Sequence, residues 1–234
     1  MKHCCEIIFF PNEVINTINK DKDNERIVNE IIDKFENESD ILKKQKLLIY
    51  FGSLNKNSLA SFRNEDLGRL YIKGTSEYEV FIKRINFEVK QIPNFKTFRY
   101  FIYLSSNIRE CENNIFKIFT IAHELQHVLQ FINVKNIHKK HSDLFRYFCS
   151  KELNRFNLPK EHDALKKSKL INYRISDKRK KVDDFINEEI NRYNKDTYKS
   201  QYWQKVKAID VDEDYDLAKE VENLWKKYKK NIEK

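Results

Sequence analysis

Turn-forming residues are scarce in this chain and unevenly distributed. Only three Gly and three Pro occur among its 234 residues, and all of them except Pro159 lie in the first half of the sequence. Gly and Pro are the residues that most often interrupt regular structure. We therefore predict a first half that alternates between helix and strand, and a second half made of helices.

The first half carries the hydrophobic patterns of one helix and several strands. Apolar residues recur at helical spacing over residues 24–35, which predicts an amphipathic helix. Short runs of aromatic and branched residues predict a small mixed or antiparallel sheet, with a turn at Gly74. The expected strands are residues 1–11, 47–51, 70–73, 85–89 and 97–104.

The second half returns to helical periodicity and keeps it. Helices are expected over residues 115–132 and 143–156, and a third begins with Pro159 in its first turn and runs to about residue 170. Further helical patterns follow Asp177. These patterns predict an α+β protein with one domain over residues 1–175 and a helical annex over residues 176–234.

The composition is that of a folded protein with a strongly solvated exterior. With 40% hydrophobic and 13% aromatic residues the chain can bury a core, which excludes fibrous and disordered classes. The net charge of +9 favours acidic partners or phosphate backbones in a non-specific way. Because carboxylates are interspersed with the basic residues, a solvated surface explains this charge, and nucleic-acid binding has no support beyond it.

The cysteine pattern and the hydropathy of the sequence indicate the cellular compartment in which the protein is expected. The four cysteines, Cys4, Cys5, Cys111 and Cys149, have neither zinc-finger spacing nor the density of a disulfide scaffold. The apolar stretch at the start of the chain is too short for a secretory signal, and every apolar run is too short to span a bilayer. A reducing, cytoplasmic location without a membrane partner is the expectation.

One motif carries chemistry. The residues His123-Glu124-Leu125-Gln126-His127 spell H-E-x-x-H and lie inside the helix expected over residues 115–132. At 100° per residue, His127 lies about 40° and Glu124 about 100° from His123 around the helix, whereas the neighbouring apolar residues lie between about 140° and 260°. The motif therefore faces away from an apolar stripe that should be buried.

Two imidazoles one helical turn apart can bind one zinc ion through nitrogen contacts of about 2.0–2.1 Å. A neighbouring Glu124 carboxylate can then reach a water on that metal. The alternative is a surface helix that carries two His and a Glu by chance, with the His side chains solvated.

The motif and its surroundings resemble the zincin metallopeptidases. Thr120-Ile121-Ala122 before the motif, uncharged Leu125 and Gln126 within it, and Val128-Leu129 after it match the longer zincin pattern. The similarity covers about residues 97–170 and is greatest to the small intracellular ImmA/IrrE-like, gluzincin-like group. No Gly and His follow His127 at metzincin spacing.

The resemblance implies a third zinc ligand and an activity. In Pro159-Lys160-Glu161-His162-Asp163-Ala164, the position of Glu161 matches the ligand carboxylate of the family. The competing ligands are Asp163, His162, His138 and His141. The implied activity is a zinc-dependent endopeptidase in which Glu124 is the general base and the substrate is an intracellular protein or peptide.

Two further expectations follow from the resemblance. The strand over residues 97–104 should form the sheet edge that pairs with an extended peptide, and a Tyr or His should stabilise the oxyanion. The candidates for that role are Tyr147, His162 and Tyr173. The rival hypothesis is a catalytically silent zincin-like binding module that contacts a protein or nucleic acid partner.

Three other patterns have plainer interpretations. Residues 210–216 begin like a calcium loop, but Tyr215 and Val221 occupy the positions that need Gly and Glu, so an acidic helix start is expected instead. The basic run at residues 178–181 is interpreted as a solvated helix start. Cys4 and Cys5 are interpreted as the start of a strand with one buried thiol.

Overall fold

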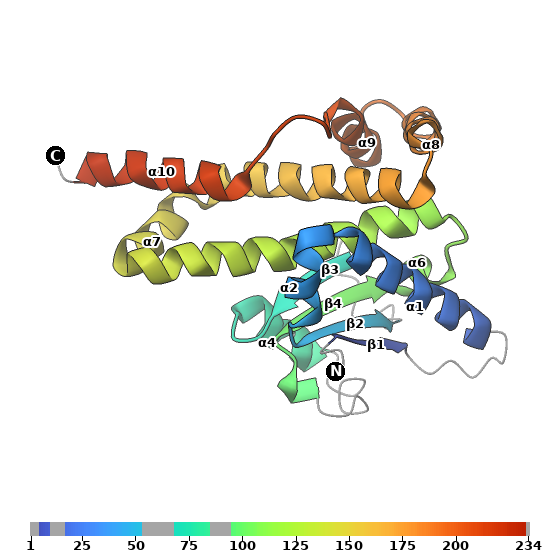
Figure 1. The fold of residues 1–234 in the computed structure, drawn as a ribbon, viewed down its shortest axis with the longest axis horizontal. Helices are drawn as coiled ribbons and strands as arrows, with labels where there is room; N and C mark the ends of the chain where they lie inside the picture. The colour runs from blue at the N-terminus through green and yellow to red at the C-terminus, as the bar shows by residue number, and fades with distance from the viewer. Residues whose placement is uncertain (1–4, 10–16, 53–67, 85–94, 233–234) are drawn as a thin grey trace. The chain divides into compact units, whose positions relative to one another are not determined.

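A computed structural model describes residues 5–9, 17–52, 68–84 and 95–232 (Figure 1). It has α+β architecture, as the sequence predicts, with a small sheet and a larger number of helices. The chain divides into two compact units, Met1–Leu125 and Gln126–Lys234. The predicted domain boundary near residue 175 stays a prediction.

The sheet of the first unit has four strands in the order β1-β2-β4-β3. They are β1 (Cys5–Phe9), β2 (Leu47–Gly52), β3 (Gly68–Ile72) and β4 (Tyr100–Ser105). The β1–β2 and β2–β4 pairs are parallel, and the β3–β4 pair is antiparallel. The sheet is therefore mixed.

The two central strands are buried on both faces. Residues 47–51 of β2 and 100–104 of β4 are at most 4% exposed, which explains why both strands are nearly continuous apolar runs. On one face the aromatic rings of the sheet meet α4 (Ser76–Arg84): Phe81 stacks on Tyr71 at 3.8 Å and meets Phe101 edge-on at 5.2 Å. This aromatic cluster anchors β3 to the rest of the sheet.

The helices of the first unit include one that the sequence patterns predict and others that they do not. The helix expected over residues 24–35 is confirmed as α1 (Thr17–Lys34). The helices α4, α2 (Ser39–Lys43) and α6 (Ser106–Glu110) were not predicted, and all are short. For α4 a local signal existed, because Thr75 Oγ1 accepts a hydrogen bond from the Tyr78 amide at 3.3 Å and caps the helix.

The predicted strands have three outcomes. Strands near residues 5–9, 47–51 and 68–72 are present, and Gly74 adopts a φ of 90° in the turn after β3, as expected of a glycine turn. The strand expected from residue 97 begins at Tyr100, because Phe95–Thr97 form a 3₁₀ turn. The strand expected over residues 85–89 lies outside the described residues.

The longest element is α7 (Asn114–Ser176), one helical run of 63 residues in which Pro159 lies internally. Three separate helices were predicted here; the structure assigns helix throughout the run instead, without the predicted ends at residues 132 and 156. A straight helix of this length would extend about 95 Å. Within the second unit, however, Gln126 donates to Asp163 at 2.6 Å, so the run doubles back, as its yellow segment in Figure 1 shows.

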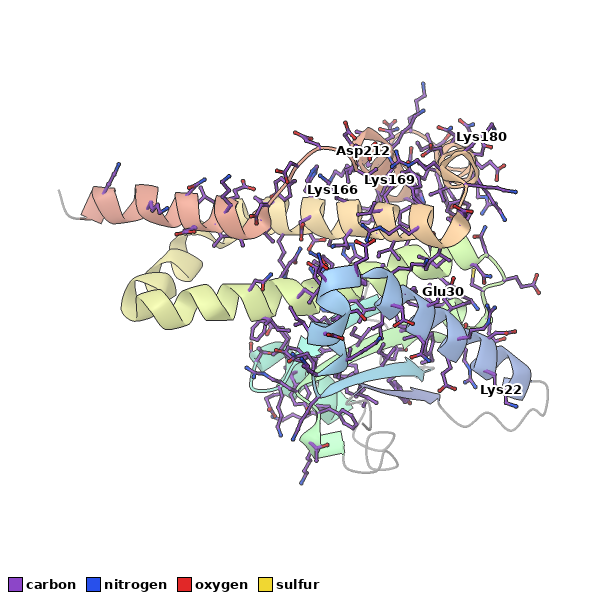
Figure 2. The ribbon with its side chains drawn as sticks, in the orientation of Figure 1. Lys22, Glu30, Lys166, Lys169, Lys180 and Asp212 are labelled. Carbon is purple, nitrogen blue, oxygen red and sulfur yellow. The ribbon has the colours of Figure 1, made fainter. Side chains whose placement is uncertain are left out.

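Three helices follow α7, as the helical patterns beyond Asp177 predict. They are α8 (Arg179–Arg192), α9 (Tyr198–Ala208) and α10 (Leu217–Ile232). Lys169 on α7 donates to the Ile209 carbonyl at 2.9 Å, and Lys166 donates to the Glu213 carbonyl. Figure 2 labels both lysines on the last part of α7. These two ammonium groups hold the segment that joins α9 to α10.

The basic run at residues 178–181 lies at the start of α8, and the acidic run at residues 210–216 leads into α10, as the sequence predicts. Arg179 forms a two-point ion pair with Asp212, at 2.8 and 2.9 Å, and Lys180 pairs with Asp184 at 2.6 Å. Asp216 accepts the backbone amides of Ala218 and Lys219 and so caps α10. No described helix contains a segment that is long and apolar enough to cross a membrane.

A buried carboxylate on α8 yields a prediction about stability. Glu189 is 6% exposed, and burial raises the pKa of its carboxyl although Arg192 lies 2.8 Å away. The folded state therefore binds this proton more tightly than the unfolded state, so ionisation above the ordinary value of 4.5 is destabilising. We expect Glu189→Gln to raise the free energy of unfolding at pH 7 by about 1 kcal/mol.

The gain should shrink as the pH falls from 7 and should vanish well below 4.5, where the carboxyl is protonated in both states. Urea unfolding at both pH values measures it. Glu188→Gln, at the exposed neighbouring position, is the matched control and should change little. Equal stability of Glu189→Gln and wild type at pH 7 would contradict the prediction.

Candidate metal centre

The orientation of the H-E-x-x-H segment on α7 agrees with the sequence prediction. The apolar stripe is fully packed, with exposures of at most 2% for Ile118, Ile121, Ala122, Leu125, Val128 and Leu129. On the other side of the helix, His123 is half-buried, and Glu124 and His127 are 7% and 8% exposed. Packing of the stripe therefore fixes how the helix presents the three motif side chains.

The predicted ligands lie close together. His127 Nε2 lies 3.4 Å from Glu161 Oε1, both within the second unit. His123 is one turn before His127 on the same helix, and one ligand atom from each of the three residues lies within 4.8 Å of the other two. The doubling back of α7 therefore places Glu161, which the sequence predicts as the third ligand, next to His127.

The separation of His127 and Glu161 suits a tetrahedral ion. Two ligand atoms that each lie about 2.1 Å from a tetrahedral zinc are about 3.4 Å apart. A direct N–H···O hydrogen bond would be shorter, at about 2.7–3.2 Å. Two imidazole nitrogens and one carboxylate oxygen are also donors that Zn²⁺ prefers. The donor set therefore fits zinc in chemistry, and the His127–Glu161 pair also fits it in spacing.

Asp163, a competing ligand in the sequence, is engaged elsewhere. Its Oδ2 accepts hydrogen bonds from the amide nitrogens of Gln126 and Gln130, at 2.6 and 2.7 Å. Gln130 Nε2 also donates to the Lys160 carbonyl at 2.8 Å, and its Oε1 lies 2.7 Å from His127 Nδ1. Asp163 therefore supports the motif helix and is not part of the ligand group.

The other candidates have different positions. His162 is exposed, and its ring meets Tyr215 edge-on at 5.2 Å. The Tyr173 hydroxyl donates to Asp183 at 2.6 Å, and burial, together with this hydrogen bond, raises the pKa of Tyr173. Tyr173 also lies about 18 Å along the helix from Glu161, so it cannot serve an oxyanion there. The side chains of His138, His141 and Tyr147 lie outside the described residues.

The sheet edge next to the motif is β3 and not the strand that was predicted. The prediction that residues 97–104 form the peptide-pairing edge is wrong, because β4 has β2 on one side and β3 on the other. Among the described strands, β3 is the edge on this side. Register in a sheet depends on long-range pairing, which the sequence pattern of one strand does not reveal.

Gly68, the first residue of β3, contacts the motif helix. A Cβ added there would lie 2.9 Å from Thr120 Cγ2, 3.0 Å from Leu104 Cδ2 and 3.2 Å from Glu124 Cγ. Any side chain larger than hydrogen would therefore press on the stem of Glu124. This residue was not among the predicted site residues, although a Gly at the start of a strand signals a close approach of this kind.

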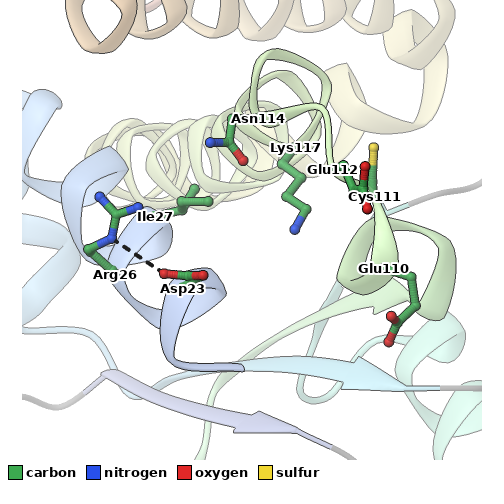
Figure 3. Close-up of a pocket in the computed structure, with 8 residues that line it drawn as sticks. All are labelled: Asp23, Arg26, Ile27, Glu110, Cys111, Glu112, Asn114 and Lys117. Atoms are coloured by element: carbon green, nitrogen blue, oxygen red, sulfur yellow. Dashed lines mark ion pairs between the residues drawn. The ribbon is translucent and has the colours of Figure 1, made fainter. Parts of the chain in front are cut away.

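A separate pocket lies in the first unit near the start of α7 (Figure 3). It has a volume of about 230 Å³, and charged side chains of both signs line it, among them Asp23, Arg26 and Lys117. Lys117 is 6% exposed and donates to Asn24 Oδ1 at 2.7 Å and to the Arg109 carbonyl at 3.2 Å. Its ammonium group therefore ties together α1, α6 and α7.

Comparisons with known proteins identify no relative: no family model, no curated protein and no solved structure matches this chain. The resemblance to zincins therefore stays a prediction that rests on the motif and its flanking residues.

Gly68 yields a prediction about packing. We expect Gly68→Ala to lower the free energy of unfolding by about 1–3 kcal/mol, because the new methyl group overpacks the contact with Thr120 and Glu124. Thr120→Ser removes the methyl group in the shortest contact, so the double variant should recover part of the loss. Urea unfolding of the four proteins measures this coupling, and strictly additive effects would show that the contact is not the cause.

Proposed function

We propose that this chain is a zinc-dependent metalloendopeptidase of the zincin type. The observation that carries the proposal is the 3.4 Å approach of His127 Nε2 to Glu161 Oε1, beside an H-E-x-x-H helix whose back is fully packed. A chance motif on a solvated helix would not need a carboxylate from a distant part of the chain at this spacing.

His123, His127 and Glu161 would hold the ion, and these three ligands leave a fourth position open. A zinc ion bound there would polarise a peptide carbonyl and lower the pKa of a bound water. The Glu161 side chain is 52% exposed, so solvent reaches this ligand directly.

Glu124 is the proposed general base. Its carboxylate would take the proton from the attacking water and return it to the leaving amine. Its stem is held beside Gly68 and Thr120, and the whole residue is 7% exposed, which limits the rotamers available to the carboxylate. A base with a restricted position loses less entropy when the reactants align.

An extended peptide is the proposed substrate, and β3 is the proposed docking edge. Strand edges bind extended peptides through backbone hydrogen bonds, with no need for a particular side-chain sequence. The first residue of β3 contacts Glu124, so a peptide paired with this edge would run close to the base. An intracellular protein is the expected source of such a peptide.

Metal content tests the proposed ligand set. We expect one zinc per purified chain by plasma mass spectrometry, and loss of that zinc in His123→Ala and Glu161→Ala. His162→Ala changes the exposed residue next to Glu161 and is the matched control that should keep the metal. Equal zinc content in wild type and Glu161→Ala would remove Glu161 from the site, and a metal-free wild type after zinc is supplied would end the proposal.

Glu124→Gln tests the general base. The variant keeps the shape of the side chain but cannot accept a proton, so we expect unchanged zinc content and a loss of 10²-fold to 10⁴-fold, roughly, in hydrolysis of an unfolded protein substrate. Cleavage followed by mass spectrometry of the fragments measures the rate. Undiminished turnover in this variant would refute the role of Glu124.

A further inference from the structure

We infer that Gln130 and Asp163 are positioning residues that hold His127 in the tautomer with its proton on Nδ1, so that Nε2 keeps a lone pair directed toward Glu161. This inference rests on the proposed metal centre, because it concerns the ring of one of its ligands. It is carried by a chain of hydrogen bonds within the second unit that turns the amide oxygen of Gln130 toward His127 Nδ1.

The chain begins with a group that can only accept. The Lys160 backbone carbonyl has no hydrogen to donate, and its neighbour is a carboxyl oxygen of Asp163. They lie 2.8 and 2.7 Å from the same end of the Gln130 side chain. That end must therefore be the NH₂ group, since an oxygen there would face two other oxygens.

The orientation of Gln130 then determines the proton on His127. With its NH₂ group committed, the amide presents Oε1 to His127 Nδ1 at 2.7 Å. An amide oxygen only accepts, so Nδ1 must carry the hydrogen. In a neutral ring the other nitrogen, Nε2, then has a lone pair, and this is the atom that lies 3.4 Å from Glu161.

The arrangement prepares the site for a cation. A cation placed between Nε2 and the Glu161 carboxylate oxygen would be bound by both atoms. Nδ1–H donation to an oxygen partner also orients the ring of a metal-bound imidazole and makes Nε2 a stronger donor. Loss of such a partner in metal sites lowers affinity by about 10-fold to 100-fold.

Asp163 is itself fixed by a second glutamine, from within the motif. Gln126 donates to Asp163 Oδ2 at 2.6 Å, and Gln126 and Gln130 are 6% and 2% exposed. The Oε1 atom of Gln126 is buried without a hydrogen-bond partner among the described residues. A buried acceptor without a hydrogen-bond partner costs free energy, and an apolar residue at position 126 would avoid that cost. We therefore explain Gln126 by its hydrogen bond to Asp163.

The test measures the tautomer in metal-free protein and the zinc affinity in parallel. Long-range ¹H–¹⁵N NMR at mildly alkaline pH identifies the protonated nitrogen of each ring, and comparison with His127→Ala assigns the signals. We expect Nδ1–H in wild type. In Gln130→Leu we expect that preference to be lost and zinc to bind about 10-fold to 100-fold more weakly in a chelator competition.

Two variants of Asp163 separate positioning from general damage. Asp163→Asn keeps an oxygen that can accept from both glutamines, so the tautomer and the zinc affinity should stay close to those of wild type. Asp163→Leu removes the acceptor and should behave like Gln130→Leu. Thermal unfolding of each variant identifies losses that come from misfolding.

The outcomes are distinct. A wild-type ring with its proton on Nε2, or on both nitrogens, would overturn the inference, and this measurement needs no variant to fold. Unchanged tautomer and zinc affinity in Gln130→Leu would overturn it too. An Nδ1–H ring in a protein that binds no zinc would support the positioning role and instead refute the proposed function.

Discussion

One carboxylate, that of Asp163, holds the two halves of α7 together beside the candidate metal centre. It accepts two amide hydrogen bonds from Gln126 and Gln130, and both glutamines are nearly fully buried. Hydrogen bonds to a charged group are worth about 1.5–3 kcal/mol each, and more is lost when one partner is left buried alone. Together with the Gln130–Lys160 hydrogen bond, this contact holds the segment that carries Glu161, two residues before Asp163, close to His127.

The first unit sets the start of α7 by other means. Burial of Ile118, Ile121 and Leu125 fixes the rotation of the helix, and Gly68 permits a strand to approach it at the level of Glu124. Lys117 fixes the entry of the helix through two hydrogen bonds. Apolar packing thus determines which way the H-E-x-x-H side chains face. The hydrogen bonds of Gln126 and Gln130 to Asp163 determine which segment lies next to His127.

Local patterns were enough to predict the parts of the structure that depend on local geometry. The spacing of apolar residues in α1 and in the first part of α7 predicted the buried face of each helix, because helical periodicity relates neighbours within a few residues. The reversal of α7 and the central place of β4 could not be predicted in this way. Both depend on pairing between distant residues, and buried Gln126 and Gln130 have the sequence pattern of solvent-facing residues.

The three proposed ligands differ in their access to water, and this difference bears on the rate at which a metal would leave. The His127 side chain is 9% exposed and that of Glu161 is 52% exposed. A carboxylate that water and competing chelators can reach is the ligand most easily detached, whereas a buried imidazole held at its second nitrogen stays in place. Metal exchange would therefore begin at Glu161, so this side chain would govern the lifetime of the bound ion more than its initial capture.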